Sequence, residues 1–336
     1  MAKITTTLLV ITILILNSCR QKNVDSQPAD PPSQDTVAVK GKDETKKTDT
    51  VTVEKELLYD KYTLENTYPY KDTTRRFQWE KIKAGLKTID SMQVEHSSWG
   101  ILQNYRNNKG EAPLVKEYHR NVYKRISDNY EVERYQSVPL YSLQDTVVPE
   151  RYGRDGSLVK LIKGTDSTKF EKIETVYFPG EWLVPRKYVK EIADSIAFRS
   201  AIFVDRINEN VVTLQKEGDK WMIRSMNPVT TGLHKPPHQQ ETPLGMFVIQ
   251  EKKYKMFFLV DGTTETGGFA PYASRFTNGG YLHGVPVNAP RKDFIEYSAS
   301  LGTTPRSHMC VRNATSHAKF IYDTFPVEGT VVFVIE

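Results

Sequence analysis

The chain has 336 residues, with 46 Lys and Arg, 41 Asp and Glu, and a formal net charge of +5 at pH 7. This length favours about two folded units plus tails. The nearly balanced charge excludes the strongly basic surface that is typical of nucleic-acid-binding proteins. With 18 Tyr, 14 Phe and 4 Trp, a globular protein with extra segments is expected.

Residues 1–18 have the layout of a secretory signal, with a basic Lys3, a short apolar run and a cysteine, Cys19, directly after it. The apolar run is about half the roughly 20 residues that span a bilayer. The segment resembles a bacterial lipoprotein signal peptide. This implies lipidation of Cys19 and an exported protein, lipid-anchored to a bacterial membrane and facing the periplasm or cell wall. An ordinary signal peptide with an incidental cysteine is the alternative.

Residues 19–56 are rich in Pro, Asp, Lys, Thr, Ser and Gln, with only isolated valines. Such a segment cannot bury enough apolar surface to offset its chain entropy, so a disordered tether is predicted.

Residues 57–130 are predicted to form a short helical region. Trp79, Ile82, Leu86 and Ile89 are spaced three, four and three apart, which predicts an amphipathic helix over about 76–92, with Gly85 as its weak point. A second, less regular helix is predicted over 114–126.

Residues 131–195 contain short apolar runs separated by turn signals, such as Asp155-Gly156. Closely spaced strands with such turns indicate a small all-β barrel. The stretch resembles a bacterial SH3-like domain. The resemblance implies either a module that binds a wall polymer or a partner, or a spacer that packs on the following domain.

Residues 199–336 begin with apolar runs at 201–205, 211–214 and 221–223, separated by turn signals. Another run follows at 242–249, so a β-rich domain is predicted before Cys310. If Cys19 carries a lipid, Cys310 is the remaining cysteine of the chain and is a free thiol in an exported protein. A free thiol in such a compartment is a candidate for reactivity.

Nucleophilic chemistry at Cys310 needs a neighbouring base or a positive field, because a thiol of ordinary pKa is mostly protonated at neutral pH. His283, at the end of an apolar run before Gly284, is a candidate base. His308 lies two positions before Cys310, so in an extended backbone both side chains share a face; it is a rival base or an orienting residue. Spacing alone does not separate the two histidines.

Downstream of Cys310, Asn313 is predicted to cap a helix that ends before Pro326. The beginning of that helix would lower the pKa of the thiol. Arg312 supplies a cation suited to a substrate carboxylate. His317 would lie on the helix, packed or solvated rather than catalytic.

These residues resemble the signature of the L,D-transpeptidase (YkuD-type) catalytic domain, in which His-Gly precedes a Ser-His-Gly-Cys motif. Here the two blocks are His283-Gly284 and 307–312, Ser-His-Met-Cys-Val-Arg. Further blocks lie at 229–232, 242–247 and 325–334. Two departures are Met309 in place of the usual glycine and a long separation of 27 positions between His283 and Cys310, which predicts a loop insertion over 288–304.

The resemblance implies that Cys310 attacks a peptidoglycan stem peptide, that His283 is the base and that Gly284 orients it. The N–H groups of Met309 and Cys310 would stabilise the oxyanion, and Ser307 and Arg312 would shape the donor pocket. No metal or organic cofactor, and no nucleic acid, is expected. The overall expectation is mainly β with some α: a helical region, an SH3-like β-barrel, and a β-sandwich catalytic domain with a C-terminal helix.

Three alternatives stay open on the same fold: a carboxypeptidase that uses water as acceptor, attachment of an acceptor protein to the wall, and a wall-binding lipoprotein without activity. A sortase also has His, Cys and Arg in this order, but its arginine lies much further from the cysteine than Arg312 does.

Overall fold

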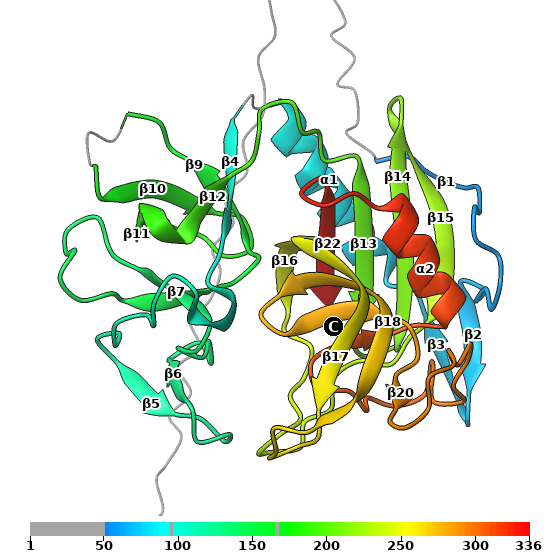
Figure 1. The fold of residues 1–336 in the computed structure, drawn as a ribbon. Coiled ribbons are helices and arrows are strands. Elements are labelled where there is room, and N and C mark those ends of the chain that lie inside the picture. Colours follow the sequence, from blue (N-terminus) through cyan, green and yellow to red (C-terminus); the bar gives the residue numbers. More distant parts are fainter. Residues whose placement is uncertain (1–50, 95–96, 165–167) are drawn as a thin grey trace, which may run out of the picture. The chain divides into compact units, whose positions relative to one another are not determined.

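The structure is a computed structural model that describes residues 51–94, 97–164 and 168–336. The predicted signal peptide at 1–18, Cys19 and residues 19–50 of the predicted tether lie outside the described residues. The described chain is mostly β with two α-helices, as predicted (Figure 1). Residues 49–336 group as one compact unit.

The strands before residue 195 are short. They are β1 (Val53–Lys55), β2 (Thr67–Tyr70), β3 (Thr73–Arg76), β4 (Ser98–Leu102), β5 (Tyr118–Arg120), β6 (Ile126–Asp128), β7 (Ser137–Leu140), β8 (Arg151–Arg154), β9 (Leu158–Leu161), β10 (Phe170–Thr175), β11 (Glu181–Pro185) and β12 (Val189–Glu191).

The later strands include the longest ones of the described chain. They are β13 (Ser200–Asp205), β14 (Asn210–Glu217), β15 (Lys220–Pro228), β16 (Gly245–Val248), β17 (Glu251–Leu259), β18 (Thr266–Thr277), β19 (Gly280–His283), β20 (Val287–Asn288), β21 (Val311–Arg312) and β22 (Thr330–Ile335). The α-helices are α1 (Trp79–Val94) and α2 (Thr315–Thr324).

A six-stranded sheet in the order β1-β15-β14-β13-β22-β16 forms the centre of the C-terminal region. Side chains alternate between the two faces of a strand. In β13, Phe203 therefore packs on the side of α1, whereas Ile202 and Val204 pack on the opposite side. Strands β13, β16 and β22 are buried on both faces, which explains their nearly continuous apolar sequences.

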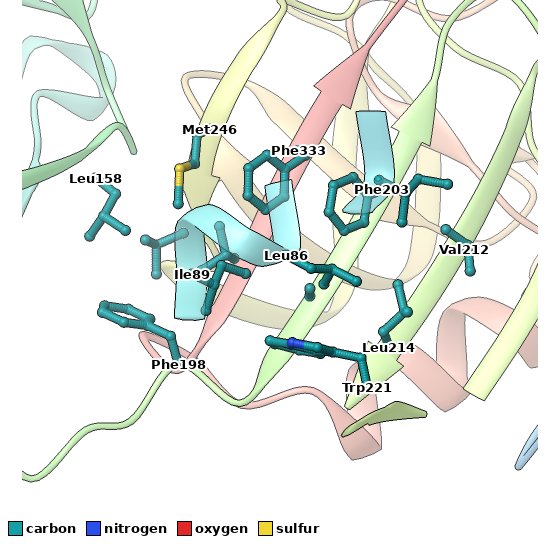
Figure 2. Close-up of a cluster of buried hydrophobic side chains, with 14 of the residues drawn as sticks. Leu86, Ile89, Leu158, Phe198, Phe203, Val212, Leu214, Trp221, Met246 and Phe333 are labelled. Carbon is teal, nitrogen blue, oxygen red and sulfur yellow. The ribbon is translucent and has the colours of Figure 1, made fainter. Parts of the chain in front are cut away.

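Helix α1 covers one face of this sheet through its predicted apolar positions, including Leu86 and Ile89 (Figure 2). Close packing explains the glycine at position 85 of this helix, because a Cβ there would lie 2.6 Å from a ring carbon of Phe203. Leu158 of β9 joins the same cluster. The upstream strands therefore share a core with the C-terminal region.

A second sheet, β17-β18-β19-β21 with β20 paired to β18, packs on the other face of the six-stranded sheet. Phe276 and Leu282 of this sheet lie in one cluster with Val332 of β22 and with Ile321 of α2. The result is the predicted β-sandwich with a C-terminal helix. The N-cap of α2 is Ala314, whose side chain makes no capping hydrogen bond. The predicted cap at Asn313 is wrong, because the Asn313 side chain bonds Val311 and His317 instead.

The predicted helical region at 57–130 is only partly helical. Helix α1 is confirmed, but the helix predicted over 114–126 is wrong, since β5 and β6 form a hairpin there. The two apolar side chains on which that prediction rested, Tyr118 and Val122, are 51% and 65% exposed. They therefore mark no buried helical face.

The upstream five-stranded sheet has the order β11-β10-β9-β4-β12. The strands predicted within 131–195 are present, but β4 comes from the stretch assigned to the helical region. The SH3-like barrel itself stays a prediction. The tether also ends earlier than predicted, because β1 pairs in parallel with β15 through backbone hydrogen bonds.

The insertion at 288–304 contains no helix, and its one strand is the end of β20. Arg75 of β3 donates hydrogen bonds of 2.7 Å to the carbonyls of Gly302 and Thr303, and Thr315 of α2 donates one to Ile295. The insertion is thus tied to its neighbours on two sides. Among the described helices, none is long and apolar enough to cross a membrane.

Candidate active site

Two short parallel strands bring His283 and Cys310 together. Strands β19 and β21 pair with Leu282 opposite Val311 and His283 opposite Arg312. Cys310 directly precedes β21 and packs against Tyr281 and Ala273. Residues opposite each other on neighbouring strands share a face, as do residues two apart along a strand. The side chains of Tyr281, His283 and Cys310 therefore belong to one face of this sheet.

His283 is held in one tautomer by its neighbour. Its Nδ1 lies 2.6 Å from the carbonyl oxygen of Gly284, which only accepts, so Nδ1 carries the proton and Nε2 is left as the basic nitrogen. Burial lowers the pKa of His283 to about 4, partly offset by this hydrogen bond. The ring is therefore neutral at physiological pH, as a general base must be.

Cys310 is a free, buried thiol with 9% of its surface exposed. Its Sγ donates to the carbonyl of Gly279 at 3.4 Å. Burial raises the pKa of Cys310 to about 11, and the nearby charge of Arg312 offsets only part of this effect. The thiol and the imidazole on this face are both neutral at rest, so nucleophilic attack requires proton transfer to a base.

Met309 adopts a conformation that favours glycine, with φ of +83°. Left-handed backbone costs a residue with a Cβ about 1–2 kcal/mol. The Thr242 hydroxyl donates to the Met309 carbonyl at 2.9 Å and helps to hold this turn. The chain therefore keeps a glycine-like backbone before Cys310 although the residue is methionine.

Ser307 supports the same turn from inside. Its hydroxyl donates to the carbonyl of Cys310, and its own N–H donates to Thr231 at 3.0 Å. Ser307 is 1% exposed. These two hydrogen bonds fix the backbone around Cys310, whereas the predicted role of Ser307 in a donor pocket stays a prediction.

Arg312 has a buried Nε with no hydrogen-bond partner within the described chain. Burial lowers the pKa of Arg312, and the neighbouring Cys310 partly offsets this. The strand register puts Arg312 opposite His283. An unpaired, partly desolvated guanidinium at this place suits a carboxylate ligand.

His308 does not face Cys310. Its Nε2 lies 2.9 Å from Asp261 Oδ2, in the turn between β17 and β18, and the side chain is 42% exposed. The predicted extended geometry fails because the positive φ of Met309 breaks the alternation between positions 308 and 310. His317 is packed, as predicted: it is fully buried and bonds Ser225 Oγ at 2.8 Å.

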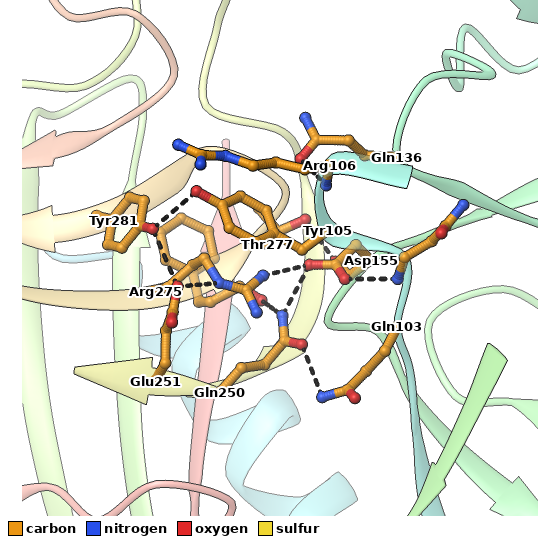
Figure 3. Close-up of polar contacts among 12 residues, drawn as sticks. Gln103, Tyr105, Arg106, Gln136, Asp155, Gln250, Glu251, Arg275, Thr277 and Tyr281 are labelled. Carbon is orange, nitrogen blue, oxygen red and sulfur yellow. Dashed lines mark hydrogen bonds and ion pairs between the residues drawn. The ribbon is translucent and has the colours of Figure 1, made fainter. Parts of the chain in front are cut away.

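A polar network reaches the site from the upstream sheets and was missed from the sequence (Figure 3). Asp155 Oδ2 contacts Arg275 Nη1 at 2.5 Å, Arg275 Nε donates to Glu251 at 2.8 Å, and Tyr281 donates to the same Glu251 oxygen at 3.1 Å. Tyr281 lies two positions before His283. In the sequence, only the two-residue spacing of Tyr281 and His283 along the apolar run 281–283 indicates that Tyr281 lies near the site. Asp155 has the sequence context of an ordinary turn residue.

No group of three or more His, Cys, Asp or Glu side chains within 51–94, 97–164 and 168–336 is arranged to hold a metal ion.

Comparison with known proteins identifies the C-terminal region. Residues 199–334 match the family model described as the L,D-transpeptidase catalytic domain, YkuD. A comparison with curated proteins finds no match.

Several solved structures are similar at low identity. L,D-transpeptidase 3 from Mycobacterium tuberculosis, in complex with a faropenem-derived adduct, has 17% identity over 55% of this chain and 93% of that chain, with a TM-score of 0.34. An Enterococcus faecium L,D-transpeptidase mutant has 12% identity over 85% and 96%, with a TM-score of 0.33. A fused Zn-dependent amidase/peptidase/peptidoglycan-binding domain-containing protein from Clostridium acetobutylicum ATCC 824 has 21% identity over 41% of this chain, with a TM-score of 0.30.

This chain spans 52% of the length of the Clostridium structure. The family match, and not these overall similarities, identifies the domain. Residues 199–334 thus match the YkuD family of L,D-transpeptidase catalytic domains, which confirms the resemblance carried by the blocks around His283 and Cys310.

Proposed function

We propose that the protein is a peptidoglycan L,D-transpeptidase in which Cys310 is the nucleophile and His283 the general base. The observation that carries this proposal is the hydrogen bond from His283 Nδ1 to the carbonyl of Gly284, because it leaves Nε2 basic on the face that Cys310 shares. The family match over 199–334 supports the same reaction class.

In the first half-reaction, His283 Nε2 takes the proton of the Cys310 thiol, and the sulfur attacks the carbonyl between an L-centre and the terminal D-residue of a stem peptide. The C–N bond then breaks. The leaving amine takes the proton from His283 and departs as D-alanine, leaving a thioester on Cys310.

In the second half-reaction, an amine of a neighbouring stem peptide attacks the thioester. His283 takes a proton from this amine and returns it to the sulfur as the C–S bond breaks. A new peptide cross-link and the free thiol result. These steps require no metal or organic cofactor.

The remaining groups would stabilise and position the donor. The N–H groups of Met309 and Cys310 would bind the developing oxyanion, as preorganised donors do in acyl transfer. Arg312, unpaired and partly desolvated, would bind a donor carboxylate. Ser307 would keep the backbone of the nucleophile in place through its bond to the Cys310 carbonyl.

Two experiments on the full chain test the reaction. Faropenem is a suitable probe, since the M. tuberculosis structure holds a faropenem-derived adduct. We expect a mass adduct on the wild type and on Cys19→Ala, and none on Cys310→Ala. Cys19 is the matched control, because these are the two cysteines of the sequence. Incubation with disaccharide tetrapeptides should then give cross-linked dimers.

Other products would identify a different function. Shortened monomers without dimers would mean an L,D-carboxypeptidase. Absence of an adduct together with retained binding of wall fragments would mean a non-catalytic wall-binding protein. An adduct on Cys310→Ala would refute the assignment of the nucleophile.

We further propose that Cys19 carries a lipid, so that the catalytic domain acts from a bacterial membrane on the nearby wall in cell-wall biogenesis. The support is the order of the basic residue, the apolar run and the cysteine in residues 1–19. Cys19→Ala should leave the membrane fraction when cells are fractionated, whereas Cys310→Ala should stay in it. A Cys19→Ala protein that still sediments with membranes would refute the lipid anchor.

A further inference from the structure

A large groove of about 1020 Å³ lies between the upstream sheets and the catalytic domain. Its upstream wall includes Tyr130, Arg151 and Trp182, and its catalytic wall includes Pro243 and Met309. The volume is at the upper end of that of small-molecule sites. Neither His283 nor Cys310 lines the groove, but Met309, the residue before the nucleophile, does. The lining of the groove thus excludes Cys310 and His283 but includes the residue next to Cys310.

Two arginines, Arg151 and Arg154, line the groove. Within the described residues, neither Arg151 nor Arg154 forms an ion pair, and the one hydrogen bond of Arg154 reaches the carbonyl of Glu131 at 3.4 Å. Burial lowers the pKa of both arginines. Asp128 is close enough to raise the pKa of both, but its carboxylate already accepts backbone N–H groups.

The acidic side chains of the groove are engaged elsewhere. Glu133 pairs with Arg125, Glu131 with His119, and Glu241 with His234. None of these three carboxylates forms an ion pair with Arg151 or Arg154, although Asp128 attracts both arginines and Glu133 attracts Arg154 at longer range. A ligand carboxylate that reaches them would gain charge-assisted hydrogen bonds in a partly desolvated place.

Aromatic rings surround the first of these cations. The guanidinium carbon of Arg151 lies 3.9 Å from the ring centre of Tyr130 and 3.8 Å from that of Phe178. Trp182, which also lines the groove, has a buried indole N–H without a partner among the described residues. Stacking fixes the arginine in place, so that less side-chain entropy is lost when an anion binds.

A transpeptidase must hold two peptides that meet at one acyl carbon. The face with Cys310, His283 and the unpaired Arg312 is suited to the donor. The groove is lined by none of these three residues, yet Met309 lines it, so its occupant would approach the thioester from a side other than that of the donor.

We propose that this groove is the acceptor site and that Arg151 and Arg154 bind a carboxylate of the acceptor stem peptide. This inference rests on the proposed transpeptidase function. Arg151 and Arg154 act as acceptor-binding residues, and the upstream sheets are thereby part of the site for the second substrate.

Binding is tested apart from chemistry with full-length Cys310→Ala, which forms no thioester. It is titrated calorimetrically with a disaccharide tripeptide, which lacks the scissile bond. Adding Arg151→Met or Arg154→Met should weaken binding about tenfold or more, whereas Arg76→Met on β3, outside the groove, should not change it. Methionine keeps most of the packing volume, and thermal melts identify any variant that fails to fold.

The ligand is varied in the same way. Amidation of the tripeptide carboxylates should weaken binding to Cys310→Ala by a similar factor. It should have little further effect on the binding by Cys310→Ala that also carries Arg151→Met or Arg154→Met. Equal affinity for carboxylate and amide, or unchanged binding by both arginine variants, would overturn the inference.

Kinetics then separate acceptor from donor. With Cys310 restored, Arg151→Met should form the faropenem adduct at the wild-type rate but raise the KM for the acceptor about tenfold. Slower acylation by the donor tetrapeptide, with an unchanged acceptor KM, would place the donor in the groove and overturn the assignment. If the wild type forms the faropenem adduct but the arginine variants bind the acceptor as the wild type does, this inference alone is refuted. If the wild type forms no adduct, the proposed function is refuted.

Discussion

Asp155 Oδ2 lies 2.5 Å from Nη1 of Arg275, with Asp155 0% and Arg275 7% exposed. The aspartate follows β8 in the upstream region, and the arginine lies on β18, next to the strand of His283. A buried charge whose partner is removed is left uncompensated, which makes such pairs costly to break. This contact therefore fixes the upstream strands to the catalytic sheet.

Asp155→Ala should lower the free energy of unfolding by about 3–5 kcal/mol, since among the described residues it leaves the buried Arg275 with Glu251 as its one ion-pair partner. The control is Glu54→Ala, because the Glu54–Lys220 pair is exposed by nearly half on both sides. That variant should change stability by less than about 1 kcal/mol. Urea unfolding measures both, and equal losses would contradict a special role for the buried pair.

Gly156→Ala should be more harmful than Gly218→Ala. Both glycines have positive φ, +87° and +59°, so both variants carry the left-handed cost of about 1–2 kcal/mol. A Cβ at Gly156 would also lie 1.9 Å from the carbonyl oxygen of Phe276, whereas nothing lies within 4 Å at Gly218. Urea unfolding should therefore show an additional loss of about 1–3 kcal/mol for Gly156→Ala alone. Similar losses for both variants would mean that the turn after β8 is not tightly docked on β18.

The placement of His283 and Cys310 on one face of the sheet was predictable because it depends on local motifs and on strands whose apolar residues recur regularly. The errors have physical causes that the sequence does not display. His308 was misplaced because a methionine adopts a positive φ one position later. The docking of Asp155 on Arg275 joins positions 120 apart in the chain, and no local pattern encodes such a contact.

His283→Gln should slow formation of the faropenem adduct by about 10²–10⁴-fold, the contribution of a general base. The matched variant His308→Gln should stay within a few-fold of wild type, because His308 bonds Asp261 instead of facing Cys310. Since the pKa of His283 is about 4, the wild-type rate should be level from pH 8 to pH 5 and fall below that. Stopped-flow mass analysis gives both rates, and a larger effect at His308 would reverse the assignment of the base.

Glu209 should make stability depend on pH. Burial raises the pKa of Glu209 to about 7, although Thr231 donates two hydrogen bonds to it. A carboxyl group with a raised pKa contributes stability below its unfolded pKa of 4.5, and this contribution is lost as pH rises through 7. Relative to wild type, Glu209→Gln should gain up to about 3 kcal/mol between pH 4.5 and 8. Urea unfolding across this range measures it, and the exposed control Glu65→Gln should show no such trend.

Met309→Gly tests whether the methionine before Cys310 strains the backbone. Glycine adopts a φ of +83° without the Cβ clash, whereas Met309→Ala removes the same long side chain but keeps that clash. Met309→Gly should therefore be about 1 kcal/mol more stable than Met309→Ala in urea unfolding. Because the turn is also held by Ser307 and Thr242, both variants should keep the geometry of Cys310 and form the faropenem adduct. Equal stability of the two variants would mean that the turn relaxes when the methionine is removed. In that case Met309 itself, rather than its neighbours, would set the backbone that presents the N–H groups to the oxyanion.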